Sequence, residues 1–424
     1  MYLRSLTLKN FRAFESLTWQ LAEGEEPGWH VLLGANGAGK SSFLRAIAIA
    51  LTGETEFTAA RRPTRDFIRR DPAVDRAVIS LTLAQSPPWD EWTLQGTTSS
   101  RPLQTELELH QDGTIHASKA FKSGRRTLWG EGRGWFSAAF GPMRRFTGGN
   151  PENVRLFAGY PRLARHLSIF GEDVALTEAL EWLRELRFKQ LERSAEPGGG
   201  TLLGRVREFV NQDGFLPHGA KLMEVTSDAV TFVDGNGVAL PVVELSDGYR
   251  AVLSMTFELI RLMASRFGED RIFSADSTQL VAPGIVLIDE VDAHLHPSWQ
   301  REIGPWLVKL FPAVQFIVTT HSPHICQTAE SGSVWTLPVP GSGDSIHRIE
   351  GEQLTRVLLG DVLHVLNSDA FGGLPGRSER AVHMLDRLAR LNRGLDRGTL
   401  SAGEKVEREQ LEGTLSPVLG DDAS

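Results

Sequence analysis

The stretch "GANGAGKSS", Gly34–Ser42, decides the fold. It fits G-x-x-x-x-G-K-[ST], in which glycines let successive backbone N–H groups curl around a polyphosphate without obstruction by side chains. The apolar stretch 28–34 before it predicts a short strand, and residues 41–51 after it predict a helix. Strand, glycine turn and helix are the context this motif needs, so we expect phosphate binding here. The apolar residues of the helix share one predicted face: Phe43, Leu44, Ile47 and Leu51.

The loop also assigns roles to its side chains. The positive end of the following helix faces the same anion as the backbone N–H groups. Lys40 is expected to reach the β- and γ-phosphates, and the Ser41 hydroxyl to ligate Mg²⁺. The predicted nucleotide-binding residues of the loop are Asn36, Gly37, Gly39, Lys40, Ser41 and Ser42.

A second stretch, "VLIDEVDAHLHP" at Val286–Pro297, allows two interpretations. In the first, Asp289 at the end of an apolar strand holds Mg²⁺, and Glu290 orients or deprotonates the attacking water. In the second, His294 and His296 join Asp289 as ligands of a transition metal. The i, i+2 histidine spacing before a helix-opening proline fits no zinc pattern, so we favour the NTPase interpretation.

Two shorter motifs each carry a plain and a functional interpretation. His321 in "VTTHSPH" (318–324) is either a satisfied cap or core residue or a hydrogen-bond donor to the γ-phosphate. Ser246 in "ELSDGYR" (244–250) is an N-cap. Alternatively, Ser246, Gly248 and the helix N-terminus bind the γ-phosphate of a nucleotide held by another subunit. The same exposed N–H groups could serve both purposes.

Composition narrows the class of protein. The 424 residues are 41% hydrophobic, enough for a substantial core, and the net charge of −8 excludes a generally basic nucleic-acid coat. Cys326 is the single cysteine, which excludes a disulfide framework and a cysteine-rich zinc module. The N-terminus lacks the plan of a signal peptide, and no apolar run approaches the roughly 20 residues that span a bilayer. We expect a soluble, cytoplasmic protein without a membrane partner.

The order of elements indicates an α/β fold. Residues 2–9 and 15–21 read as paired strands, and 76–118 reads as strands with a turn at Asp112-Gly113. Strands at 284–289 and 315–320 alternate with helices, which is typical of a parallel sheet buried on both faces. The predicted division is an N-terminal lobe with the phosphate loop, a helical insertion, a C-terminal lobe and a C-terminal helical region: 1–150, 151–220, 221–345 and 346–424.

The C-terminal region predicts a helical hairpin. "SERAVHMLDRLARL" carries apolar residues at helical spacing, and Ser401 with Glu404 forms a capping-box pattern at the start of the next helix. Such a hairpin packs on its own domain or docks a partner, and both alternatives remain open.

Taken together, "GANGAGKSS", "LSDGYR", "VLIDEVDAHLHP" and "TTHSP" resemble the head of an ABC-type ATPase, a P-loop NTPase with a mostly parallel sheet, an antiparallel β subdomain and a helical lid insertion. The N-terminal "LTLKNFRAFESL" and the "FPAVQFIVTTHSP" block are similar to the RecF/SMC-like branch. Within that branch, the chain resembles overcoming-lysogenization ATPases. It also resembles Septu-type and retron-associated anti-phage defence ATPases, which work with a separate HNH nuclease subunit.

This resemblance implies a mechanism. Two heads would form a homodimer around two Mg·ATP molecules, each held between one subunit's phosphate loop and the other's Ser246. Hydrolysis by Glu290, sensed by His321, would open the dimer. Asp292 matches a loop that contacts the partner subunit, and Arg12 matches an N-terminal arginine near the nucleotide.

The chain also departs from the family. The signature lacks the glutamine of transporters, which argues against an importer subunit, and the lid glutamine has no clear counterpart, Gln95 and Gln104 being the candidates. Residues 43–244 contain no sustained heptads for a coiled-coil arm. Residues 346–424 are too few for the second, nuclease domain of overcoming-lysogenization proteins, so we expect the chain to cut nothing by itself.

Three hypotheses therefore stay open. The preferred one is a dimeric ATPase that regulates a nuclease partner, with DNA or RNA as a candidate ligand. The second is a RecF-like DNA repair ATPase, for which ATP-stimulated, salt-sensitive binding to gapped duplex would be diagnostic. The third is a nucleotide-gated scaffold that binds ATP, assembles and hydrolyses slowly.

Overall fold

A computed structural model gives the protein's structure for most of the chain. The described residues are 1–90, 102–130, 134–142, 159–171, 177–193, 201–216, 219–366, 371 and 378–419. They form two compact units, Met1–Val362 and Leu363–Ser424. The finer division predicted at residues 150, 220 and 345 stays a prediction. In the described part of the chain, every helix is too short or too polar to cross a membrane.

The first unit is built on a six-stranded sheet. In spatial order its strands are β14 (His347–Arg348), β13 (Gly332–Thr336), β3 (Gly28–Leu33), β12 (Val314–Thr319), β11 (Gly284–Ile288) and β7 (Ser137–Phe140). All neighbouring pairs are parallel except β13 with β14. Every residue of β3, β11 and β12 is buried, as expected for a parallel sheet that is covered on both faces. The α/β prediction is confirmed.

A five-stranded antiparallel sheet forms the predicted β subdomain. Its order is β2 (Phe14–Gln20), β1 (Tyr2–Phe11), β4 (Arg76–Ala84), β5 (Leu103–His110) and β6 (Ile115–Ala117). The fully buried amide of Gln315 on β12 connects the two sheets. Its Oε1 accepts from the Leu3 N–H at 2.7 Å, and its Nε2 donates to the Leu3 carbonyl at 2.8 Å. This pair satisfies both ends of a buried polar group, which fixes β1 against β12.

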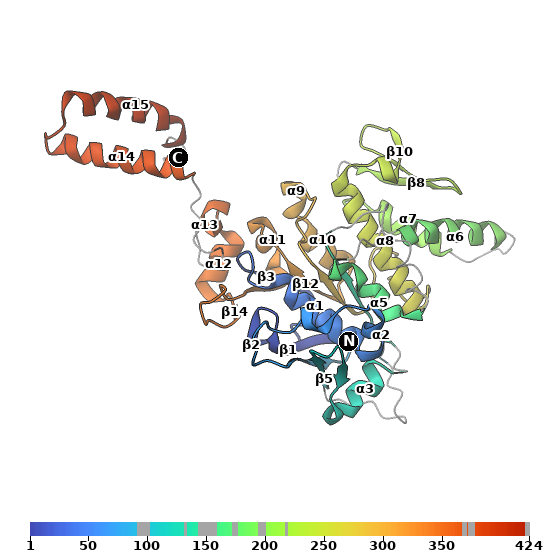
Figure 1. Ribbon diagram of the computed structural model, residues 1–424. Coiled ribbons are helices and arrows are strands. Elements are labelled where there is room, and N and C mark those ends of the chain that lie inside the picture. The colour runs from blue at the N-terminus through green and yellow to red at the C-terminus, as the bar shows by residue number, and fades with distance from the viewer. Residues whose placement is uncertain are drawn as a thin grey trace. The chain divides into compact units, whose positions relative to one another are not determined.

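Helix α1 (Lys40–Thr52) contacts strands of both sheets (Figure 1). The sequence predicted one apolar face, and its four residues are buried. Ala46, Ala48, Ile49 and Ala50 are buried as well, so the helix is enclosed on nearly all sides. The prediction of a single face was too narrow, because a helix between two layers must be apolar all round. Helix α2 (Glu54–Ala59) follows directly.

The helical insertion and the signature region form the rest of the first unit. Helices α5 (Pro161–His166), α6 (Thr177–Arg193) and α7 (Leu202–Asn211) lead to a small sheet, β8 (Lys221–Val225), β9 (Val230–Val233) and β10 (Ala239–Pro241). The long helix α8 (Asp247–Phe267) comes next and contacts α6 (Figure 1). Its other described α-helices are α3 (Lys122–Leu128), α9 (Pro297–Gln300), α10 (Ile303–Leu310), α11 (Pro323–Gln327) and α12 (Gly351–Leu359), and α13 (Val362–Leu366) begins at the boundary with the second unit.

The second unit contains the predicted helical hairpin, α14 (Glu379–Asp396) and α15 (Ala402–Leu419). The Arg387 guanidinium donates twice to the Glu407 carboxylate, at 2.9 and 2.7 Å, and so joins the two helices. The predicted capping box is confirmed: the Ser401 N–H donates to the Glu404 carboxylate, and the Glu404 N–H donates to the Ser401 hydroxyl.

Candidate functional site

The phosphate loop lies between β3 and α1, as predicted. Gly39 is the N-cap of α1 and has φ 97°, in the left-handed region. A Cβ at this position would lie 2.5 Å from Cζ of Phe14. Conformation and space therefore both require glycine. Asn36 and Gly37 are exposed, so the open side of the loop is available to a ligand.

Lys40 folds over the loop from the first turn of α1. Its Nζ donates to the carbonyl oxygens of Gly34, at 2.8 Å, and Ala35, at 3.3 Å. The residue is only 8% exposed. Burial lowers the pKa of Lys40, and the carboxylates of Asp289, Glu290 and Asp292 oppose this shift. The ammonium group therefore lies in the field of the acidic stretch that follows β11.

Thr319 organises the start of that acidic stretch. Its hydroxyl donates to Oδ1 of Asp289 at 2.6 Å and accepts from the Glu290 N–H at 2.8 Å. The Asp289 N–H donates to the Phe140 carbonyl of β7 at 2.8 Å. Asp289 is 2% exposed, whereas Glu290 is exposed. Glu290 also has φ 47°, a conformation that costs free energy in a non-glycine residue and is common at functional sites.

A second threonine hydroxyl, that of Thr320, joins Asp292 to the segment around His321. The Thr320 hydroxyl donates to Oδ1 of Asp292 at 2.5 Å and accepts from the Ser322 N–H at 2.9 Å. The Ser322 hydroxyl donates to the side-chain oxygen of Gln300 at 2.6 Å. His321, between these anchored residues, has an exposed side chain. The loop therefore has a fixed backbone and presents an imidazole to solvent.

The charge state of His321 follows from its surroundings. Partial burial lowers its pKa, the Lys40 ammonium lowers it further, and the carboxylates of Asp292, Glu290 and Asp289 oppose these effects. The imidazole is therefore neutral at pH 7 and can donate one hydrogen bond while it accepts another.

His294 and His296 were the residues of the rival metal interpretation. The His296 imidazole accepts from the Ser298 N–H at 3.3 Å and caps α9, a role the sequence analysis missed. Among the described residues, no group of three or more His, Cys, Asp or Glu side chains is arranged to hold a metal ion.

A Mg²⁺ ion would need fewer protein ligands, because it keeps several waters. The two predicted ligands, Ser41 and Asp289, offer the hard oxygen donors that Mg²⁺ prefers. The Ser41 hydroxyl makes no hydrogen bond with any described residue, and Asp289 presents a carboxylate oriented by Thr319. This donor set fits the ion.

Arg12 is brought to the phosphate loop by the turn between β1 and β2. Its guanidinium lies 3.5 Å from the Ser42 hydroxyl and 5.7 Å from the centre of the Phe67 ring. Burial lowers the pKa of Arg12, with smaller effects from nearby charges. Arg12 therefore lies beside the phosphate loop, and its role toward a nucleotide stays a prediction.

The signature segment differs from the rest of the site. Ser246 is the N-cap residue of α8, as the plain interpretation predicted, but its exposed side chain makes no capping hydrogen bond. The Arg250 guanidinium instead bridges the first turn, donating to Asp247 and to the Val243 carbonyl. A Cβ on Gly248 would lie 3.2 Å from the His294 carbonyl. Within the described residues, no hydrogen bond joins Ser246 or Gly248 to the phosphate loop.

The structure thus brings together Lys40, Asp289, Glu290 and His321, whose charges act on one another, whereas no hydrogen bond between described residues joins Ser246 or Gly248 to the phosphate loop. The main residues missed by the sequence analysis are Thr319 and Thr320. Both stand in the quoted "VTTHSPH", but their role depends on the register that pairs Ile288 with Val318 and so places Thr319 beside Asp289. Of the candidates for a lid glutamine, Gln104 lies exposed on β5, and Gln95 lies outside the described residues.

The part of the chain that contains these site residues is similar to known proteins. Residues 30–327 match the family described as "AAA domain, putative AbiEii toxin, Type IV TA system". A stretch of 123 residues, 29% of the chain, is 42% identical to "Retron Ec83 probable ATPase" of Escherichia coli and covers 22% of it. A stretch of 324 residues, 76% of the chain, is 25% identical to "Septu protein PtuA" of Bacillus mycoides and covers 38% of it. The chain therefore spans less than half of either relative.

Among solved structures, the Smc head domain with an extended coiled coil from Pyrococcus furiosus is similar. The TM-score is 0.49 at 14% sequence identity, over 84% of this chain and 98% of that one.

Proposed function

The chain belongs to the AAA-domain family that residues 30–327 match, and we propose that it is an Mg²⁺-dependent ATPase that hydrolyses ATP to ADP and phosphate. The resemblance to retron-associated and Septu-type ATPases is confirmed by the relatives found. The observation that carries the proposal is the Thr319 contact. One hydroxyl orients Asp289 and the Glu290 backbone at the carboxyl end of β11. β12, which leads to His321, is the neighbouring strand, and β3, which leads to the phosphate loop, lies on the other side of β12.

Each residue has a role in this proposal. Lys40 exchanges its contacts with the loop carbonyls for the β- and γ-phosphates, and its charge compensates theirs. Ser41 and Asp289 hold Mg²⁺, which supplies charge neutralisation at the phosphate oxygens when bound. The exposed Glu290 carboxylate accepts a proton from the attacking water, and neutral His321 donates to the γ-phosphate. Arg12 and Ser42 contribute to the edge of the nucleotide site.

We further propose a homodimer with composite sites. The α8 N-terminus offers backbone N–H groups and the Ser246 hydroxyl, which no residue of the phosphate loop engages within the chain. An anion held by a second copy would use them, and a twofold axis would create two equal sites. Asp292 is already bound to Thr320, so any contact it makes with the partner would use its remaining acceptor capacity.

The biological setting proposed here is anti-phage defence in the cytoplasm, with a separate nuclease subunit of HNH type and DNA or RNA as the ligand. The similarity to the retron-associated ATPase and to the Septu protein supports this proposal. Because the chain covers less than half of each relative, the partner has to be identified by experiment. Co-purification and a phage challenge would test it: a chain that stays active without a partner and gives no growth phenotype would contradict it.

The catalytic part is tested with Glu290→Gln. The variant keeps the size and exposed position of the side chain but removes the base, so ATP hydrolysis should fall about 10²- to 10⁴-fold. ATP binding, measured by equilibrium dialysis, should stay within about twofold because the phosphate loop is unchanged. Equal hydrolysis by both proteins would contradict the role of Glu290. Slow turnover in both, with intact ATP-linked assembly, would favour a nucleotide-gated scaffold.

A further inference from the structure

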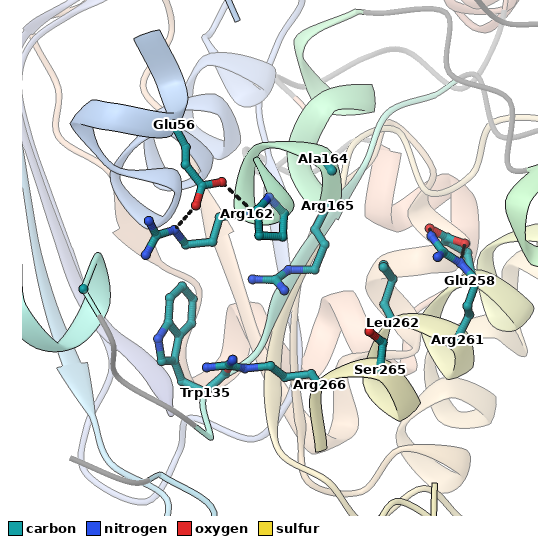
Figure 2. A pocket seen from close by; sticks show the side chains of 12 residues that line it. Glu56, Trp135, Arg162, Ala164, Arg165, Glu258, Arg261, Leu262, Ser265 and Arg266 are labelled. Carbon is teal, nitrogen blue, oxygen red and sulfur yellow. Dashed lines mark hydrogen bonds and ion pairs between the residues drawn. The ribbon is translucent and has the colours of Figure 1, made fainter. Parts of the chain in front are cut away.

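A polar cavity lies away from the phosphate loop. It has a volume of about 410 Å³ and is formed by α2, α5, the second half of α8 and the segment before β7 (Figure 2). Trp135 precedes β7, so this cavity is at the amino-terminal edge of the parallel sheet, whereas nucleotides bind at the carboxyl edge. The 13 residues of α1, about 20 Å of helix, separate Lys40 from the start of α2. This is therefore a different site.

Arginines dominate its lining: Arg162, Arg165, Arg261 and Arg266. We call this cavity the arginine pocket. Two carboxylates also line it, and each is already paired: Glu56 with Arg162 at 2.8 Å, and Glu258 with Arg261 at 2.7 Å. Glu56 accepts two backbone N–H groups as well, at 2.7 and 3.0 Å. The acidic residues of the pocket are thus committed to their own partners.

Arg165 is the exception. Among the described residues it has no hydrogen bond and no ion pair, and its Nε is completely buried without a partner. Its guanidinium packs over the Phe136 ring at 5.8 Å. Figure 2 shows this guanidinium and that of Arg266 directed into the space beside Trp135. Burial lowers the pKa of Arg165 to about 10; the charge of Arg266 lowers it further, and the Glu56 carboxylate opposes the shift. The group is therefore still charged at neutral pH.

A guanidinium with a buried N–H and no hydrogen-bond partner is unfavourable unless a ligand supplies the acceptor. Guanidinium groups that converge from two elements match the oxygens of phosphate, which accepts several charge-assisted hydrogen bonds at once. The volume falls within the range of pockets for small molecules.

We propose that the arginine pocket binds a small phosphate-bearing anion of up to mononucleotide size, with Arg165 as its central ligand. The occupant would contact α8, whose N-terminus carries Ser246, and α2, which follows the helix that carries Lys40. This proposal does not depend on ATP hydrolysis by the chain.

The test is isothermal titration of the full chain with sodium pyrophosphate. The Lys40→Ala background removes competition from the phosphate loop, and binding of one pyrophosphate per chain should remain. Adding Arg165→Gln should weaken that binding about tenfold or more. Arg271→Gln is the matched control, because Arg271 is an exposed arginine that packs on Trp89 outside the pocket, and it should leave the affinity unchanged.

Thermal unfolding and titrations with other ligands complete the test. Arg165→Gln should unfold at no lower temperature than its parent, since it removes a buried N–H that has no hydrogen-bond partner. If that variant does not fold, Arg165→Lys, which keeps the charge but loses the planar fork, should weaken pyrophosphate binding instead. Absence of pyrophosphate binding in the Lys40→Ala chain, or equal weakening by the Arg165 and Arg271 substitutions, would overturn the proposal. Equal affinity for succinate would reject phosphate as the ligand class, and much tighter binding of a 5′-phosphorylated oligonucleotide would assign the pocket to a nucleic-acid end.

Discussion

The two halves of the nucleotide site are held in contrasting ways. In the phosphate-loop half, Lys40 and Asp289 are 8% and 2% exposed, and Thr319 fixes the acidic strand end with two hydrogen bonds. In the signature half, Ser246 is exposed and makes no capping hydrogen bond. The first half is part of the core of the first unit, and the second is a helix end open to solvent.

Because of this difference, substitutions in the two halves should affect stability and ATP hydrolysis differently. A substitution in the buried half removes contacts that also hold the fold, so it should reduce both stability and hydrolysis. A substitution at the exposed helix end should reduce hydrolysis alone, because only a second copy of the chain would contact it.

Ser246→Arg should have the largest effect on activity and nearly none on stability. The long cation would fill the space of an incoming nucleotide at the α8 N-terminus, so ATP hydrolysis should fall by about 100-fold or more. The free energy of unfolding, measured with urea, should change by less than about 0.5 kcal/mol, as for other surface substitutions. Ser227→Arg, at another exposed serine, is the control and should hydrolyse ATP normally. Normal turnover of Ser246→Arg would contradict a role for the signature.

Thr319→Val should reduce both ATP hydrolysis and the free energy of unfolding. It keeps the shape of the side chain but removes the hydroxyl that orients Asp289 and accepts from the Glu290 N–H. Hydrolysis should fall about 10- to 100-fold, as for other residues that orient a metal ligand. Because buried polar groups lose their partner, stability should fall by about 1–3 kcal/mol. Thr256→Val removes another buried hydroxyl, on α8, and controls for the loss of stability alone. Unchanged hydrolysis in Thr319→Val would show that the contact is only structural.

Lowering the pH should destabilise the fold around the phosphate loop, because His30 on β3 is buried in its neutral form. Its Nδ1 lies 2.8 Å from the Ser333 hydroxyl and its Nε2 2.9 Å from the Glu26 carbonyl, and burial lowers its pKa from 6.5 to about 4. Between these values the unfolded chain binds a proton that the folded chain does not. Stability is therefore intact above pH 6.5 and falls as the pH drops toward 4, by up to about 3 kcal/mol from this group.

Urea unfolding at pH 7, 6, 5 and 4.5 measures this loss. His30→Gln, which does not titrate, should show a shallower decline than the parent. Part of the decline should remain, because His166, also fully buried, has its pKa lowered to about 3. The same pH dependence in both proteins would mean that His30 is not responsible.

The sequence predicted the buried half well, for a local reason. The apolar strand, the glycine turn and the following helix are contiguous, and Asp289 ends a run of five apolar residues. Such patterns require no knowledge of distant residues, and the structure has Lys40 at the start of α1 and Asp289 directly after β11. The same holds for the capping box of Ser401 and Glu404, whose partners are three residues apart.

The features that the sequence did not reveal depend on distant pairing. Thr319 meets Asp289 only through the register of β11 with β12, and α1 is enclosed because a second sheet covers it. The cap by His296 needed the local backbone geometry, and the arginine pocket combines residues from four separate segments. Periodicity and motif spacing contain no information on such contacts.

The composite site is tested most directly by mixing two inactive variants, Lys40→Ala and Ser246→Arg. Each homodimer would have two defective sites, since every site combines one phosphate loop with one signature. In a heterodimer, one site has the intact loop of the Ser246→Arg chain and the intact signature of the Lys40→Ala chain. An equal mixture should therefore recover about one quarter of wild-type ATP hydrolysis, because half of the dimers would have one working site of two. Recovery of this size would establish that Ser246 acts on a nucleotide held by another copy, and a mixture as inactive as its components would contradict it.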